Sequence, residues 1–123
     1  MSEKIDILSV PVSNQAAAKA FYVDVLGFTV VSDSPMGPDQ RWVQLRPAGG
    51  GTSIALVTWY ETMSAGSLRG VVLETDDIAS TRAALTARGL KLSPVEKQPW
   101  GDFANFSDPD GNGWILLQPP RQG

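Results

Sequence analysis

The chain has 123 residues, of which 42% are hydrophobic and 19% charged, a composition typical of one globular domain with its own core. Its net charge of −3 argues against nucleic-acid binding, which requires a basic surface for the phosphates. The chain has no Cys, which excludes disulfides and thiolate chemistry, and no His, which removes the commonest base at neutral pH and the commonest transition-metal ligand.

The first quarter of the chain predicts a strand followed by a helix. Residues 5–12 alternate weakly and contain Pro11, which suits a strand leaving its sheet. Either Ser13 or Asn14 caps the helix that follows, and Gly27 ends it. The spacing of its apolar residues predicts a buried stripe formed by Ala17, Ala20, Phe21 and Val25.

Three more strands and a linker are expected before the pattern starts again. Residues rich in Gly and Pro at 33–38 and 47–51 indicate turns, and residues 60–69 are polar and predict a linker. The strands between these segments are expected at residues 28–32, 41–46 and 52–59.

The second half repeats this order. Residues 70–75 predict a strand, Asp76 or Asp77 caps a helix that ends at Gly89, and residues 90–95 predict another strand. The segment 103–118 predicts a hairpin, because Asp108-Pro109-Asp110-Gly111 has the residue order of a type I turn. The fold class is therefore α+β, with two tandem βαβββ modules that form an open, cup-shaped mixed sheet and carry their helices on the outer face. We expect one domain over residues 1–123, with module one at about 5–59, the linker at 60–69 and module two at about 70–118.

Four segments carry a resemblance to a known family: VSNQAAAKAFYVDVLGF, RWVQLRPAGGGTSIALV, GVVLETDDIAS and FSDPDGNGWILLQ. Together they resemble the glyoxalase/bleomycin-resistance/extradiol-dioxygenase superfamily, also called vicinal oxygen chelate proteins. The resemblance implies two paired βαβββ modules that form a cup, usually in a dimer, and in the family enzymes a divalent metal held in that cup by His and Glu. The corresponding positions here are Ile7, Ala55, Gly70 and Ile115, none of which can ligate a metal through its side chain. We therefore expect no metal and no other cofactor.

Strand alternation predicts which side chains share the cup face with those positions. The predicted lining is aliphatic and aromatic with a few polar groups, which is typical of small-molecule pockets. Glu74 is the one carboxylate of this set, and we expect Arg46 or Arg41 to pair with it. The predicted ligand-binding residues are Ile7, Ser9, Trp42, Gln44, Ala55, Val57, Trp59, Glu74, Trp100, Phe103, Asn105 and Ile115.

Three functions fit these features. The first is a cytosolic, homodimeric protein of the bleomycin-resistance type that sequesters an apolar or aromatic drug or natural product, without catalytic residues. The second is a lyase, isomerase or dioxygenase that uses unusual metal ligands such as Glu74, Asn105 and Gln44, or metal-free acid/base chemistry by Glu74. The third is a module that serves protein association. Metal analysis of protein purified without chelator separates the second from the first. The N-terminus lacks the pattern of a signal peptide, and no apolar run reaches membrane-spanning length, so neither a membrane nor a nucleic acid is an expected partner.

Overall fold

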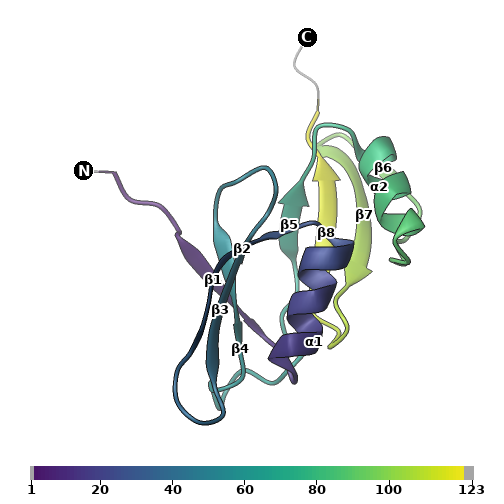
Figure 1. Cartoon of the computed structure of the whole chain (residues 1–123). Coiled ribbons are helices and arrows are strands. Elements are labelled where there is room, and N and C mark those ends of the chain that lie inside the picture. Colours follow the sequence, from purple (N-terminus) through teal and green to yellow (C-terminus); the bar gives the residue numbers. More distant parts are fainter. Residues whose placement is uncertain (1, 121–123) are drawn as a thin grey trace.

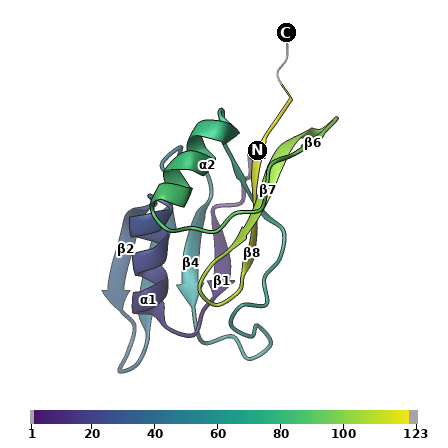
Figure 2. The same ribbon diagram turned by 90° about the vertical axis from the view of Figure 1, so that its right-hand side faces the viewer.

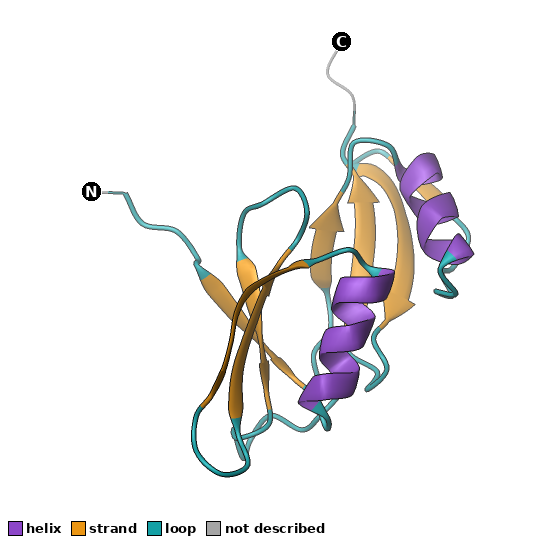
Figure 3. Ribbon diagram, viewed as in Figure 1, coloured by secondary structure: helices purple, strands orange, loops and turns teal. Residues whose placement is uncertain are grey.

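The computed structural model describes residues 2–120 and contains two four-stranded sheets, one from each half of the chain, with a helix between the first and second strands of each (Figures 1 and 3). This confirms the predicted α+β fold of two βαβββ modules with open sheets. The elements are β1 (Ile7–Pro11), α1 (Gln15–Ala20), the π-helical segment η1 (Phe21–Val25), β2 (Thr29–Pro35), β3 (Arg41–Arg46), β4 (Ser53–Val57), β5 (Val71–Glu74), α2 (Ile78–Ala87), β6 (Glu96–Gln98), β7 (Gly101–Ser107) and β8 (Gly113–Gln118).

The two sheets have the same topology. The first sheet has the strand order β1-β4-β3-β2 and the second has the order β5-β8-β7-β6. In each, the first strand of the module pairs in parallel with the last one, and the remaining pairs are antiparallel. Such an arrangement leaves β1 and β5 each with one unpaired edge.

Local chemistry explains where the helices begin and end. The side chain of Asn14 accepts a hydrogen bond from the N–H of Ala17, and Asp77 does the same for Ser80, so each helix has an N-cap. Gly27 adopts φ 77° after the first helical segment, a left-handed conformation that glycine reaches without strain.

In Figure 2 both helices lie nearer the viewer than β2 and β4, and the core lies between the helices and the sheets. Tyr22 and Phe28 from the first module contact Trp114 of the second, with ring centroids 5.7 and 6.0 Å apart. Phe106 stacks on the same indole at 6.0 Å. A single hydrophobic core therefore joins the two modules on the helix side and leaves the opposite faces of the sheets uncovered by helices.

The predicted stripe on the first helix is wrong for Ala17 and Ala20, whereas Phe21 and Val25 are partly buried and pack against the core. Ala18, Tyr22 and Leu26 are buried, whereas Ala17 is exposed. The buried positions are four residues apart and begin at Ala18, before the helix widens to a π-helix at Phe21. The inward position at Tyr22 is fixed further by the bond from its hydroxyl to Asp108, which no local pattern reveals.

Two strand predictions also differ from the structure. Residues 90–95 do not form a strand, because Pro94 has no N–H for a ladder; Ser93 hydrogen-bonds to Asn105, and β6 begins only at Glu96. The second strand reaches Pro35 and includes part of the predicted loop, since a bulge between Val30 and Ser32 lets it stay paired with β3.

No helix within residues 2–120 is long and apolar enough to cross a membrane.

Candidate functional site

The helix-free face of the first sheet forms one candidate binding surface. Val43, Leu45, Ile54 and Leu56 belong to the core, so strand alternation places their neighbours on the other face, as expected. We call this face the first wall. It consists of Ile7, Ser9, Trp42, Gln44, Arg46, Ser53, Ala55 and Val57.

A chain of hydrogen bonds fixes the polar groups of the first wall. The indole Nε1 of Trp42 donates to Gln44 Oε1 at 3.1 Å, and Gln44 Nε2 donates to Ser53 Oγ at 2.8 Å. Ser53 Oγ donates in turn to the carbonyl oxygen of Asp6 at 3.1 Å. Both polar atoms of Gln44 therefore already have partners within the chain. Ser53 was missed by sequence reasoning, because only the pairing of β3 with β4 brings it next to Gln44.

Aromatic side chains stand at one end of the first wall. The rings of Trp42 and Trp59 are 6.5 Å apart with an interplanar angle of 29°. Tyr60, which is 50% exposed, lies 6.2 Å from Trp59. Ala55 and Val57, by contrast, are covered within the chain, so of these side chains the aromatic group offers the accessible apolar area.

The helix-free face of the second sheet forms a second surface, which we call the second wall. Trp114, Leu116, Ala104 and Phe106 belong to the core, and the residues between them face outward. Cross-strand partners extend this face to the edge strands on both sides. The second wall consists of Val72, Glu74, Glu96, Phe103, Asn105, Ile115 and Leu117.

The second wall carries its own aromatic pair. Trp100, which is 55% exposed in the β6–β7 turn, stacks on Phe103 with centroids 5.0 Å apart. Glu96 lies directly opposite Phe103 in the hairpin and shares its face. Glu96 was missed by sequence reasoning, since the strand was expected to end before it; the Pro99-Trp100 turn was the available indication of a hairpin here.

The prediction that Arg46 or Arg41 pairs with Glu74 is wrong. Arg41 pairs with Asp33 on β2, with Nε and Oδ1 2.8 Å apart. Arg46 lies on the first sheet and takes part in no ion pair found within residues 2–120. Glu74 is exposed and borders a groove of about 460 Å³, whose apolar residues include Phe28, Val72 and Leu116.

The positions that hold a metal in the family enzymes do not fit one here. Ile7 and Ile115 present hydrocarbon from β1 and β8, Ala55 presents a buried methyl group, and Gly70 has no side chain. Among the described residues, no group of three acidic side chains lies close enough together to hold an ion. No step of metal chemistry can be derived from these side chains.

The chain belongs to the Glyoxalase/Bleomycin resistance protein/Dioxygenase superfamily, because residues 4–116 match the sequence pattern of that family. It is 47% identical to TnmS3, an antibiotic binding protein from Streptomyces sp. CB03234, whose crystal structure superposes with a TM-score of 0.89 and 98% coverage of each chain. A member of the same superfamily from Sphaerobacter thermophilus DSM 20745 is 37% identical, with a TM-score of 0.85 and coverage of 95% of this chain and 98% of that one. The protein YetH of Bacillus subtilis (strain 168) is 33% identical over 96% of this chain and 100% of its own length.

Proposed function

We propose that this protein binds and sequesters an apolar or aromatic small molecule, such as an antibiotic or related natural product, and catalyses no reaction on it. One observation carries the proposal: the family's metal positions hold Ile7, Ala55, Gly70 and Ile115, and all of these except Gly70 lie on walls rich in apolar and aromatic side chains. Apolar area with sparse polar groups supplies affinity for small molecules. The similarity to TnmS3, an antibiotic binding protein, supports the same proposal.

We propose further that the protein acts as a homodimer, in which a second copy covers the walls. In the single chain, Val72 is 51% exposed and Ile7 is 36% exposed, although both lie on these faces. Covering such apolar area stabilises an association. Sedimentation of the protein should show a dimer, and Val72→Lys should shift it toward monomer.

We place the protein in the cytosol, a location that fractionation of the source cells tests.

The binding proposal is tested by calorimetric titration with a panel of planar natural products, followed by a resistance assay in a sensitive host. Trp59→Leu should weaken binding about tenfold or more, because an indole that contacts a flat ligand contributes large apolar area. Met36→Ala, at an exposed residue of the β2–β3 loop outside both walls, is the matched control and should bind normally. Absence of saturable binding across the panel would overturn the proposal, as would a stoichiometric transition metal in protein purified without chelator.

A further inference from the structure

We propose that the ligand is a planar aromatic cation, whose positive charge is recognised by Glu74 and Glu96 on the second wall. This inference rests on the binding function proposed above and names the chemical class of its ligand. It starts from the distribution of charge over the two walls.

The second wall is acidic. Cross-strand pairing aligns one row of side chains on this face, with Glu74 opposite Leu117, Leu117 opposite Phe103 and Phe103 opposite Glu96. The row therefore has a carboxylate at each end and apolar side chains between them. None of the seven residues that define this wall is Lys or Arg. The side chain of Arg69 lies against Gly113 at one end of the same face, where its guanidinium donates to the backbone carbonyls of Gly66, Leu68 and Gly111. Lys97, on the same edge strand as Glu96, is opposite Asp102 and faces the other way.

The two carboxylates are not neutralised within the chain. Both ion pairs found within residues 2–120 involve Asp33, which lies on the first sheet. The side chains of Glu74 and Glu96 take part in no hydrogen bond found in the same part of the chain, and both are exposed to solvent. A ligand that covers this wall removes water from them, and that is costly unless the ligand supplies positive charge or donors.

The neutral polar groups of the first wall cannot offset the cost of desolvating Glu74 and Glu96, because they already have partners. Gln44 Nε2 is already bonded to Ser53, and the Trp42 indole N–H to Gln44. The one cation of the first wall, Arg46, ends β3 at the opposite end from Trp42 and borders a groove that Asp6 also lines. Polar selectivity beside the aromatic side chains is therefore expected to reside in the second wall, while the first wall contributes its aromatic end. The stacked pair of Trp100 and Phe103 lies beside Glu96 and adds aromatic faces, which attract cations as well.

Three ring systems of the same shape test this inference: 9-aminoacridine, a cation at neutral pH; acridine, which is neutral; and acridine-9-carboxylate, an anion. We expect calorimetric titration of the full-length protein at low salt to show that the cation binds about fivefold or more tightly than the neutral ring, and the anion most weakly. The preference should shrink as salt is added, because salt screens exposed charges.

Variants assign the preference to these carboxylates. Glu74→Gln keeps the shape of the side chain and should reduce the preference for 9-aminoacridine to about twofold; Glu96→Gln should have a smaller effect of the same sign. Asp24→Asn is the matched control, because Asp24 is an exposed carboxylate on η1 and belongs to neither wall. This variant should keep the full preference.

The outcomes separate the inference from the function on which it rests. Equal binding of the three rings, or a preference that Glu74→Gln and Glu96→Gln both leave intact, overturns the charge recognition and leaves the binding function standing. The inference also fails if Glu74→Gln and Arg46→Gln each convert the dimer to monomer, because Arg46 of a second copy is then the partner of Glu74. Failure of the wider natural-product panel overturns the binding function itself.

Discussion

Two aspartates hold the first helical segment against strands, and they do so in opposite environments. Asp108 lies in the turn between β7 and β8, is 5% exposed, and connects to the helix through Tyr22. Asp33 lies on the edge strand β2 and connects to the helix through Lys19, with Nζ and Oδ2 2.6 Å apart.

Asp108 is surrounded by neutral donors. Its Oδ2 accepts hydrogen bonds from the Tyr22 hydroxyl at 2.7 Å and from Asn112 Nδ2 at 2.8 Å. Its Oδ1 accepts from the backbone N–H groups of Asp110 and Asn112 at 3.0 and 2.9 Å. Asn112 also donates to the carbonyl of Pro11 and accepts from the N–H of Leu68. Asp108 and Asn112 together thus connect both modules and the linker.

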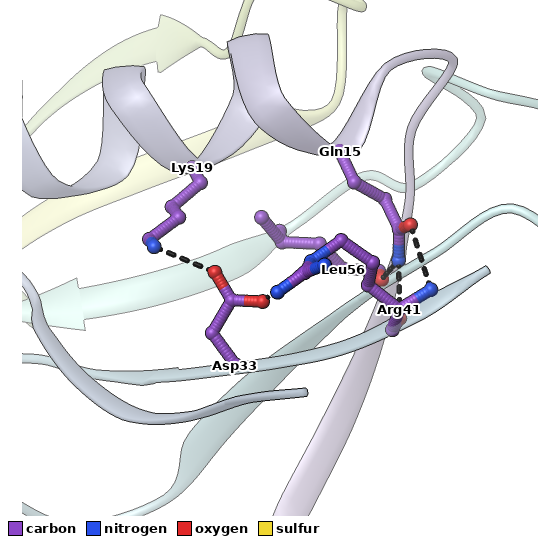
Figure 4. Close-up of polar contacts among 5 residues, drawn as sticks. All are labelled: Gln15, Lys19, Asp33, Arg41 and Leu56. Atoms are coloured by element: carbon purple, nitrogen blue, oxygen red, sulfur yellow. Dashed lines mark hydrogen bonds and ion pairs between the residues drawn. The ribbon is translucent and has the colours of Figure 1, made fainter. Parts of the chain in front are cut away.

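Asp33 is paired with cations at the surface (Figure 4). Lys19 and Arg41 both contact it, and about half of the Arg41 side chain is exposed. Hydrogen bonds from Lys19 and then from Arg41 lower the pKa of Asp33 below its ordinary value of 3.8. Nearby, Gln15 Nε2 donates to the carbonyls of Arg41 and Leu56, a neutral connection between the same helix and the strands.

The difference shows where the fold depends on polar contacts. Removing a buried acceptor leaves several donors desolvated and unpaired, so its loss is expensive. An exposed ion pair exchanges with water and contributes little. The junction between the modules should therefore be sensitive to single atoms, whereas the attachment of α1 to β2 should tolerate change.

The largest effect is expected from Asp108→Ala, which breaks the buried half of this comparison. Four donors lose their acceptor, and we expect the free energy of unfolding to fall by about 4 kcal/mol. Urea denaturation followed by far-UV circular dichroism measures it. Asp24→Ala, at an exposed aspartate, is the control and should change stability by less than about 0.5 kcal/mol. A loss below about 1 kcal/mol for Asp108→Ala would refute the importance assigned to this junction.

The second-largest loss of stability is expected from Gly66→Ala in the linker. Gly66 is buried with φ 80°, and a Cβ there would overlap with the carbonyl oxygen of Asp110. Left-handed strain and displacement of the turn should together cost about 3 kcal/mol. Gly50 has nearly the same φ of 84° with open space around it. Gly50→Ala therefore measures the cost of the left-handed backbone alone, about 1 kcal/mol of unfolding free energy. Equal losses in the two variants would show that the turn does not constrain the linker.

Tyr22→Phe removes only one oxygen from the junction and should cost about 2 kcal/mol near neutral pH, since Asp108 loses a donor and the Trp114 indole N–H loses its acceptor. Burial, and then the charge of Asp108, raise the pKa of Tyr22 far above its ordinary value of 10.0. The unfolded chain therefore releases this proton above about pH 10 while the native chain keeps it, and stability falls as pH rises, by about 1.4 kcal/mol per pH unit.

Urea denaturation between about pH 9 and pH 11 tests this sign. Tyr22→Phe should lack the alkaline loss that Tyr22 causes, and Tyr60→Phe, at a half-exposed tyrosine of the linker, should retain it. Identical pH profiles for the unaltered chain and Tyr22→Phe would contradict the assignment.

Local sequence patterns predicted the parts of this fold that local chemistry determines. The turn closed by the bond from Gly111 N–H to the carbonyl of Asp108 depends on neighbours within a few residues, and so do the two helix caps. For each cap the sequence left two candidates, and the structure selects Asn14 over Ser13 and Asp77 over Asp76. The identity of the partner of Glu74 could not be predicted in the same way. Charge pairing depends on which strands become neighbours, and Asp33 attracts Arg41 because the β2 bulge keeps their strands paired.

The candidate walls show the same division. Alternation correctly assigned Trp42, Gln44 and Phe103 to helix-free faces, because one strand suffices to set the direction of its side chains. Alternation could not reveal that the Gln44 side chain donates a hydrogen bond to Ser53, or that Glu96 lies on the second wall. Both facts follow from pairing between strands. The roles of these side chains in ligand binding stay predictions.

The smallest effect is expected from Asp33→Asn, which breaks the partly exposed half of the comparison; the side chain of Asp33 is 19% exposed. Its ion pairs are screened by solvent, so the variant should lose well under 1 kcal/mol at neutral pH. Because the folded-state pKa lies below the ordinary value, the stabilisation is present above about pH 4 and fades as pH falls through the folded-state value. The difference between the two proteins should therefore vanish in acid and also in high salt, which urea denaturation at several pH values and salt concentrations measures. Gln15→Ala is a neutral comparison at the same contact, and its loss should not depend on salt. A loss for Asp33→Asn as large as that for Asp108→Ala would mean that burial does not separate the two aspartates.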